Sequence, residues 1–135
     1  MFTVSLISWY KKNYRKLPWR NTNEPYIIWV SEIILQQTRV DQGLPYFKNF
    51  IERFPSLASL AKSKEEEVLN QWQGLGYYSR ARNMHYTAKY IFNHLNGIFP
   101  NKYKELIKLK GIGDYTASAI ASFSFNEPKA VIDGN

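Results

Sequence analysis

The sequence predicts an all-α fold, because apolar residues recur with helical spacing along nearly the whole chain and no long stretch alternates as a strand does. The chain has 135 residues, of which 44% are apolar, so it is long enough to bury a real core within one domain. Each short amphipathic helix must cover its apolar stripe with another helix. A bundle of short helices is therefore expected.

The first segment, from Met1 to Tyr10, predicts an amphipathic helix over about residues 2–14. It lacks the basic leader and small-residue cleavage site of a signal peptide. The Ser63–Glu66 pair predicts a capping box, and Asn96-Gly97 predicts a helix stop. Further helices are expected near residues 26–37, 39–53, 56–61, 64–72, 79–95, 101–109 and 114–124.

The chain is basic, with a formal net charge of +7 and a pI near 9.6. This balance favours a polyanionic partner, although solubility alone also explains it. The absence of cysteine excludes a disulfide framework and any cysteine-ligated metal or iron–sulfur cluster within this chain. No apolar run is long enough to span a membrane. We expect a cytoplasmic protein that is not bound to a membrane.

A glycine-rich hairpin is expected between the last two helices, over residues 109–117. Gly111 and Gly113 allow a tight turn with outward-facing amides, and the helix that follows offers unpaired N–H groups to a DNA phosphate. An ordinary glycine-rich turn between helices is the alternative. The full pattern Leu-x-Gly-Ile-Gly-x-x-Thr-Ala favours DNA. Lys108 and Lys110 would add attraction, and Asp114 is expected to point away from the anion.

Glu32 is the only charge in a helix that is apolar on almost every face. Its helical neighbours include Ile28, Trp29 and Leu35. Desolvation there would raise the pKa of the carboxyl and leave a protonated acid near neutral pH, as a general acid requires. The alternative is a structural Glu that reaches solvent or pairs with a buried Arg.

Several stretches together resemble adenine DNA glycosylase, the MutY family. They run in the family's order from about residue 15 to the end of the chain. The matching stretches are Leu17–Arg20, Trp29–Glu32, Leu35–Thr38, Pro45–Phe47, Arg53–Pro55, Gly74–Asn83, the hairpin, and Val131–Asn135.

The resemblance implies a six-helix barrel that carries a helix–hairpin–helix motif, beside a second helical lobe. Residues 1–20 would be a helix and connector belonging to that second lobe. Residues 21–135 would be the barrel, with the helix–hairpin–helix near 101–124. The lobe that holds a [4Fe-4S] cluster and the domain that reads 8-oxoguanine would be absent, so the chain is expected to be a truncated core that holds no cofactor.

The resemblance also implies the chemistry. The family flips out adenine mispaired with 8-oxoguanine or guanine in double-stranded DNA and hydrolyses its N-glycosidic bond. Glu32 would protonate the base, and an ionised Asp133 would stabilise the cationic sugar. Tyr115 and Asn135 would support the site around Asp133.

Other positions match residues that contact DNA. Gln37 and Tyr77 would wedge into the duplex, and Gly111, Gly113 and Lys110 would hold phosphate. Arg80 and Arg82 would contact backbone phosphate or simply solvate their helix. The adenine pocket would be lined by Arg15, Leu17, Trp19, Arg20 and Val40, of which Trp19 and Val40 could instead be core residues. The hairpin would hold a monovalent cation on the carbonyls of Ile107, Leu109 and Ile112.

Tyr115 separates this chain from bifunctional relatives of the endonuclease III type, which carry a Schiff-base lysine at that position. A monofunctional glycosylase is therefore expected. The truncated chain is expected to have little activity alone. The helix face formed by Phe2, Leu6, Trp9 and Tyr10 is expected to be partly uncovered or buried in self-association.

Three other functions remain open from the sequence. The chain could be a non-catalytic helix–hairpin–helix DNA-binding module, which would need neither Glu32 nor Asp133. It could be an interaction protein with incidental basic charge. It could also be a mismatch glycosylase that acts on thymine or uracil.

Overall fold

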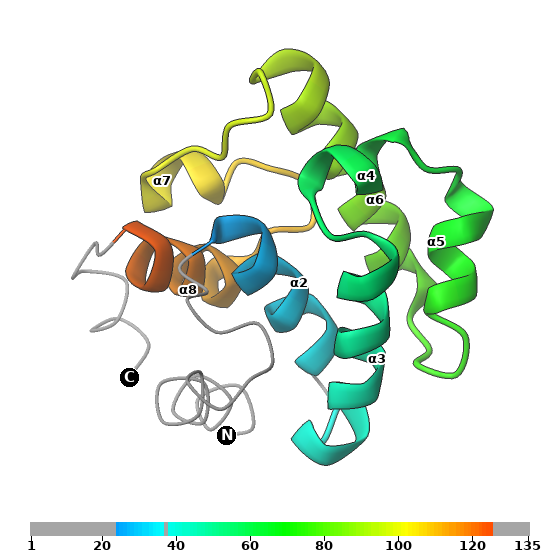
Figure 1. Cartoon of the computed structure of the whole chain (residues 1–135). Coiled ribbons are helices and arrows are strands. Elements are labelled where there is room, and N and C mark those ends of the chain that lie inside the picture. The colour runs from blue at the N-terminus through cyan, green and yellow to red at the C-terminus, as the bar shows by residue number, and fades with distance from the viewer. Residues whose placement is uncertain (1–23, 37, 126–135) are drawn as a thin grey trace.

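The computed structural model describes residues 24–36 and 38–125. These residues form helices without any strand, so the all-α prediction is confirmed for the described part of the chain (Figure 1). The helices are α2 (Pro25–Leu35), α3 (Val40–Arg53), α4 (Leu57–Lys62), α5 (Glu65–Gln71), α6 (Tyr78–His94), α7 (Tyr103–Leu106) and α8 (Asp114–Phe125).

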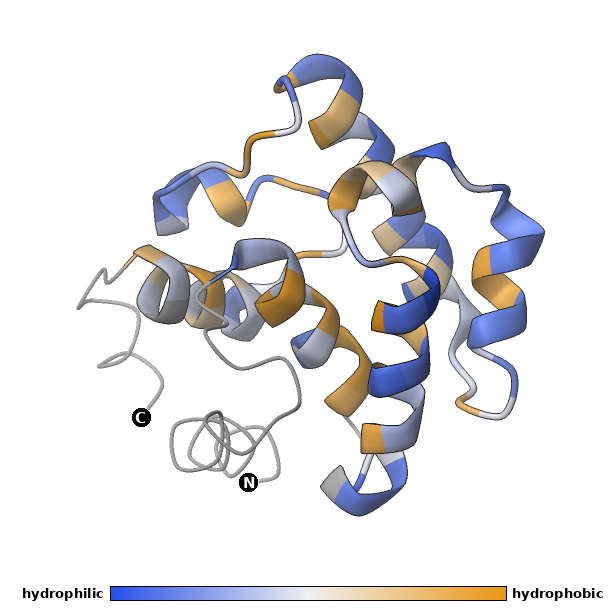
Figure 2. Ribbon diagram, in the orientation of Figure 1, coloured by the Kyte–Doolittle hydropathy of each residue, from blue (hydrophilic) through white to orange (hydrophobic). Residues whose placement is uncertain are grey.

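Helix α2 is the central element of the fold, and its residues 26–35 are all buried. It packs against α8 on one side and α3 on the other (Figure 1). Pro25 fits its first turn because the missing N–H would have had no helical partner there. Trp29 is fully buried and meets Phe99 edge-on, with ring centroids 5.4 Å apart. The apolar sequence of α2 thus builds the core (Figure 2).

The boundary between α4 and α5 corrects one prediction. The Ser63–Glu66 capping box is wrong, because Ser63 ends α4 and its Oγ donates to the Leu60 carbonyl at 2.7 Å. Helix α5 starts one residue later, where the Glu67 carboxylate accepts a hydrogen bond from the Lys64 amide at 3.0 Å. The two helices are joined so closely that Ser63 completes the first and cannot also cap the second.

The ends of α6 and α7 show how the chain reaches the hairpin. Asn96 and Gly97 both have positive φ, and the Gly97 amide donates to the Ile91 carbonyl at 2.9 Å, so the predicted helix stop is confirmed. Helix α7 is shorter than the predicted 101–109. After it, the amides of Lys108 and Leu109 bond carbonyls three residues back, which tightens the chain into a turn.

Within the described ranges, no helix has the length and apolar character needed to cross a membrane.

Candidate functional site

Glu32 lies in the middle of α2 and is completely buried. Neither of its carboxylate oxygens has a hydrogen-bond partner among residues 24–36 and 38–125. Burial raises the pKa of Glu32 to about 8. The sequence prediction of a raised pKa is confirmed. The alternative that Glu32 reaches solvent is wrong, and no described arginine pairs with it.

A carboxyl with this pKa keeps its proton at neutral pH. It can therefore donate that proton to a basic atom placed beside it, as a general acid does. A buried polar group without a partner is costly for stability, so its presence in the core calls for an explanation other than packing. Proton transfer to a ligand is such an explanation.

A groove opens beside the turn of α2 that carries Glu32. Its volume is about 340 Å³. Three elements line it: the end of α2, the first turns of α6 and the hairpin between α7 and α8. The lining residues are Ile33, Gln36, Arg80, Asn83, Gly111, Ile112 and Gly113. Ile33 directly follows Glu32 in α2, so the groove reaches the part of α2 that carries the buried acid, while Glu32 itself is not among the lining residues.

A hydrogen bond between Arg80 of α6 and Gln36 at the end of α2 connects these two helices across the groove. The Arg80 guanidinium Nη1 donates to Gln36 Oε1 at 3.0 Å. Burial of this cation lowers the pKa of Arg80 from its ordinary value, although it stays protonated. A fixed positive charge therefore stands at the wall of the groove.

The two glycines of the hairpin have different reasons to be glycine. Gly111 has a φ of +79°, and a Cβ there would lie 2.9 Å from Asn83 Cβ, so the fold itself requires glycine. Gly113 has no left-handed φ, and a Cβ there would meet no described heavy atom within 4 Å. The Gly113 carbonyl accepts the Ala117 amide at 2.9 Å, which places Gly113 at the start of α8. Within the described chain, nothing explains a glycine at 113.

Two side-chain hydrogen bonds hold the hairpin in place. The Thr87 hydroxyl of α6 donates to the Lys110 carbonyl, and the Tyr103 hydroxyl of α7 donates to the Asp114 carboxylate. The Asp114 carboxylate is thus held by α7. The hairpin leads directly into α8, and the N-terminal end of a helix carries a partial positive charge that favours a negatively charged group.

A second loop presents Tyr77 to solvent immediately before α6. Its side chain is 69% exposed, and its backbone is left-handed, with φ 52° and ψ 56°. Such a conformation costs a bulky residue about 1–2 kcal/mol. The loop is braced by Tyr46, whose hydroxyl donates to the Gln73 carbonyl at 3.0 Å, and by Trp72, whose Nε1 donates to the Gly76 carbonyl at 3.1 Å. A strained, braced and exposed aromatic side chain is typical of a functional position.

A buried neutral acid thus lies in α2, and the end of this helix forms one wall of a groove that the hairpin before α8 also bounds. Residues 30–135 match the HhH-GPD superfamily of base excision DNA repair proteins. The chain belongs to this superfamily.

The HhH-GPD chain is 50% identical to an adenine DNA glycosylase of Buchnera aphidicola subsp. Baizongia pistaciae over its whole length, which is 39% of that protein. It is 41% identical to an adenine DNA glycosylase of Mus musculus over 99% of the chain and 28% of the mouse protein. The chain therefore spans well under half the length of these relatives. A solved thermostable thymine-DNA glycosylase has the same fold, with a TM-score of 0.74, 24% identity, and 93% of this chain and 58% of that chain covered.

The HhH-GPD core brings some of the sequence-predicted residues together. Arg80, Gly111 and Gly113 line one groove beside the helix of Glu32. Arg82 does not join them, because its Nε lies 3.5 Å from the Glu65 carboxylate on the exposed α5 side. Tyr115 is half-buried in the first turn of α8.

The cation prediction falls on the hairpin turn of the HhH-GPD core. The Leu109 carbonyl accepts the Ile112 amide at 3.1 Å, so part of its bonding capacity is used inside the turn. Among the described residues, no cluster of three His, Asp or Glu side chains could hold a metal ion.

Several predicted site residues lie outside the described residues, and for Val40 the structure gives only the backbone, as the first residue of α3. The residues outside are Arg15, Leu17, Trp19, Arg20, Gln37, Asp133 and Asn135, together with the helix face of Phe2, Leu6, Trp9 and Tyr10.

Sequence reasoning missed two polar residues of the groove, Gln36 and Asn83. Gln36 precedes the predicted wedge residue and holds Arg80 in place. Asn83 lies three residues after Arg80 in α6 and packs against Gly111. The helical spacing of Arg80 and Asn83 was the available signal, since residues three apart share a helix face.

Proposed function

We propose that this chain is the catalytic core of a DNA glycosylase that removes adenine mispaired with 8-oxoguanine or guanine in double-stranded DNA. The observation that carries the proposal is Glu32, a fully buried acid without a described partner, in the helix whose end forms one wall of the groove at the hairpin. The identity of 41–50% to proteins named adenine DNA glycosylase supports adenine as the base.

In the proposed reaction, the adenine leaves the helical stack so that its glycosidic bond becomes accessible. Glu32 gives its proton to N7 of the base, and the bond between C1′ and N9 breaks with its electron pair moving to the base. The ionised Asp133 stabilises the cationic sugar until water adds to it. Tyr115 and Asn135 support Asp133.

The DNA contacts of the proposal are divided between the hairpin and the loops before α3 and α6. The amides around Gly111 and Gly113 hold a phosphate, with Lys110 adding charge. Gln37 and Tyr77 fill the space that the flipped base leaves. Arg80 contacts the backbone, whereas the ion pair with Glu65 makes Arg82 a weaker candidate. The adenine pocket is assigned to Arg15, Leu17, Trp19, Arg20 and Val40.

The proposed enzyme is monofunctional. Position 115 carries a tyrosine, which has no amine to form a Schiff base with the sugar. Incubation of the complete protein with substrate and borohydride should release adenine without a trapped protein–DNA complex. Efficient trapping together with strand cleavage would contradict this assignment.

The second lobe and its cofactor complete the proposal. Residues 1–20 are assigned to that lobe, and a [4Fe-4S] cluster is assigned to the complete protein. The cluster does not fit this chain, because the chain has no cysteine to hold iron. The isolated chain is expected to have little activity, and the helix face of Phe2, Leu6, Trp9 and Tyr10 is expected to be partly uncovered or buried in self-association. A cytoplasmic, nucleoid-associated location follows from the proposed substrate.

A base-release assay with the complete protein tests the function. Duplexes with adenine opposite 8-oxoguanine or guanine are compared with duplexes that carry mispaired thymine or uracil. Glu32→Gln should abolish adenine release while duplex binding persists, and Glu52→Gln, an exposed glutamate of α3, should leave release unchanged. Unchanged release by Glu32→Gln would remove Glu32 from the chemistry, whereas duplex binding without any adenine release by the parent protein would favour the non-catalytic DNA-binding module.

A further inference from the structure

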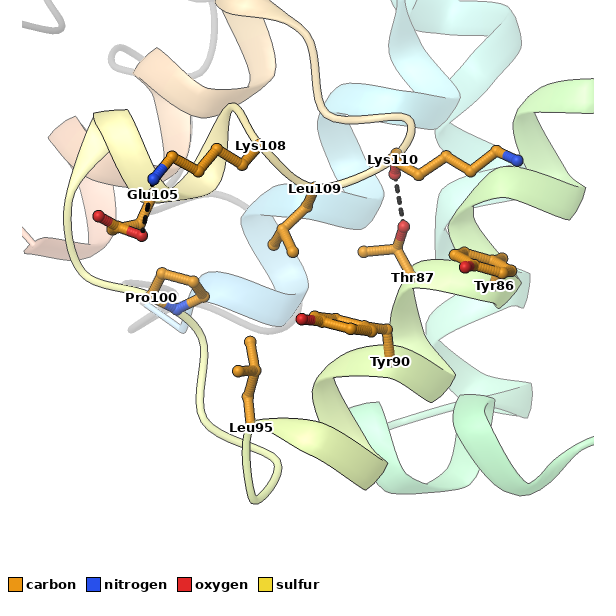
Figure 3. Close-up of a pocket in the computed structure, with 9 residues that line it drawn as sticks. All are labelled: Tyr86, Thr87, Tyr90, Leu95, Pro100, Glu105, Lys108, Leu109 and Lys110. Carbon is orange, nitrogen blue, oxygen red and sulfur yellow. Dashed lines mark hydrogen bonds and ion pairs between the residues drawn. The ribbon is translucent and has the colours of Figure 1, made fainter.

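A second cavity lies on the far side of Lys110 from the groove and has no role in the proposed reaction. Its volume is about 430 Å³, and it lies between α6 and the segment 95–110 (Figure 3). Its floor is apolar: Tyr90, Leu109, Leu95 and Pro100 point toward its centre from different sides. Such a concave apolar surface with exposed tyrosines is rarely left without an occupant.

Cationic side chains stand at the rim of this cavity. The Lys110 ammonium lies 5.0 Å from the centre of the Tyr86 ring, and Tyr86 is 58% exposed. On the opposite rim, the Lys108 ammonium lies 3.7 Å from the Glu105 carboxylate. Both members of this pair are largely exposed, so the pair holds Lys108 only weakly.

The cavity continues the groove along one face of α6. Arg80 and Asn83 line the groove, and Thr87 and Tyr90 line the cavity. From Arg80 to Tyr90 the helix rises about 15 Å, which corresponds to a few nucleotides along one DNA strand. The Thr87 hydrogen bond to the Lys110 carbonyl lies between the two hollows and fixes their spacing.

We propose that this cavity, with Tyr86, Tyr90 and Lys108, binds the DNA backbone that continues past the phosphate held by the hairpin. The inference rests on the proposed function and adds to it a second backbone site. A sugar–phosphate unit has an apolar sugar and an anionic phosphate, which match an apolar floor and a lysine rim. The Tyr86 hydroxyl is a phosphate donor of the kind that fixes register without reading sequence.

The charged residues at the rim give a test whose outcome depends on the sign of the charge on the bound group. In the complete protein, Lys108→Gln should weaken binding to a long duplex roughly three- to tenfold near 0.1 M salt and lower the salt slope by about one. Glu105→Gln should strengthen binding, because it removes a repulsive charge and frees Lys108. Lys64→Gln, an exposed lysine at the start of α5, is the matched control and should have no effect.

Duplex length separates this inference from the proposed function. A duplex that is shortened at the end beyond the hairpin cannot reach the cavity. The effects of Lys108→Gln, Glu105→Gln and Tyr86→Phe on binding should therefore be absent with the short duplex. Gly113→Ala should weaken the binding of both the long and the short duplex. Equal binding of the long duplex by all the cavity variants, with adenine release intact, would overturn the inference alone and leave the cavity to a protein partner. Absence of DNA binding and of adenine release would overturn the proposed function.

Discussion

Asn83 of α6 lies against the backbone of Gly111, so closely that a Cβ at position 111 would be 2.9 Å from the Asn83 Cβ. This contact fixes the hairpin against the helix that carries Arg80. It also separates the two hairpin glycines into one that the fold needs and one that it does not.

The first prediction concerns that separation. Gly111→Ala should lower the free energy of unfolding by about 2 kcal/mol, because the left-handed backbone and the Asn83 contact both disfavour a side chain. Gly113→Ala should leave stability unchanged or raise it by about 0.5 kcal/mol, yet weaken DNA binding at least tenfold. Urea unfolding and fluorescence anisotropy measure the two effects. Loss of stability without loss of binding in Gly113→Ala would show that the turn is only structural.

The second prediction concerns the pH dependence of stability. The pKa of Glu32 is raised to about 8, so between its ordinary value near 4.5 and about 8 the folded chain keeps a proton that the unfolded chain releases. The free energy of unfolding should therefore fall as pH rises through this window. Glu32→Gln cannot ionise and should lack this component. By about pH 8, its free energy of unfolding should exceed that of the parent by up to roughly 4 kcal/mol.

Urea unfolding of both proteins at several pH values between about 4 and 9 measures this difference. Glu52→Gln, with an exposed side chain, should follow the parent curve. Parallel curves for the parent and Glu32→Gln would mean that the acid is ionised at no cost in the folded chain, and the general-acid role would lose its physical basis.

The third prediction concerns Tyr77. Tyr77→Asn removes the exposed ring and introduces asparagine, a residue that tolerates the left-handed backbone at this position. Stability should stay within about 0.5 kcal/mol of the parent, whereas adenine release should fall at least tenfold because nothing supports the flipped-out state. Single-turnover release and a thermal melt measure the two. A large drop in the melting temperature together with the loss of adenine release would show that Tyr77 acts in packing instead.

The fourth prediction concerns the anchor between α6 and the hairpin. Thr87→Val removes the hydroxyl that donates to the Lys110 carbonyl, so this part-buried carbonyl loses its partner. The free energy of unfolding should fall by about 1–2 kcal/mol, and DNA binding should weaken as the hairpin loosens. Thr87→Ser keeps the hydroxyl and serves as the control. Identical behaviour of the two variants would show that the bond does not position the hairpin.

The sequence predicted the helices because their apolar spacing is regular, and it predicted the raised pKa of Glu32 because Ile28, Trp29 and Leu35 surround it on the helix. It erred at Ser63, where two helices meet and either could have used the same side chain. The pairing of Arg82 with Glu65 and the packing of Asn83 on Gly111 were not predictable, since both join segments far apart in the chain. Position 113 could be interpreted as a phosphate contact only by a resemblance, because glycine alone also suits a tight turn.

Thermostability engineering commonly replaces glycine with alanine wherever the backbone permits it. On this chain such a programme would reject position 111 and accept position 113, since only the latter has an ordinary φ and free space around it. The product would be as stable as the parent or slightly more stable, so an unfolding assay without a duplex would show no defect. Under the proposed function, only an assay that includes a DNA duplex would reveal the lost binding.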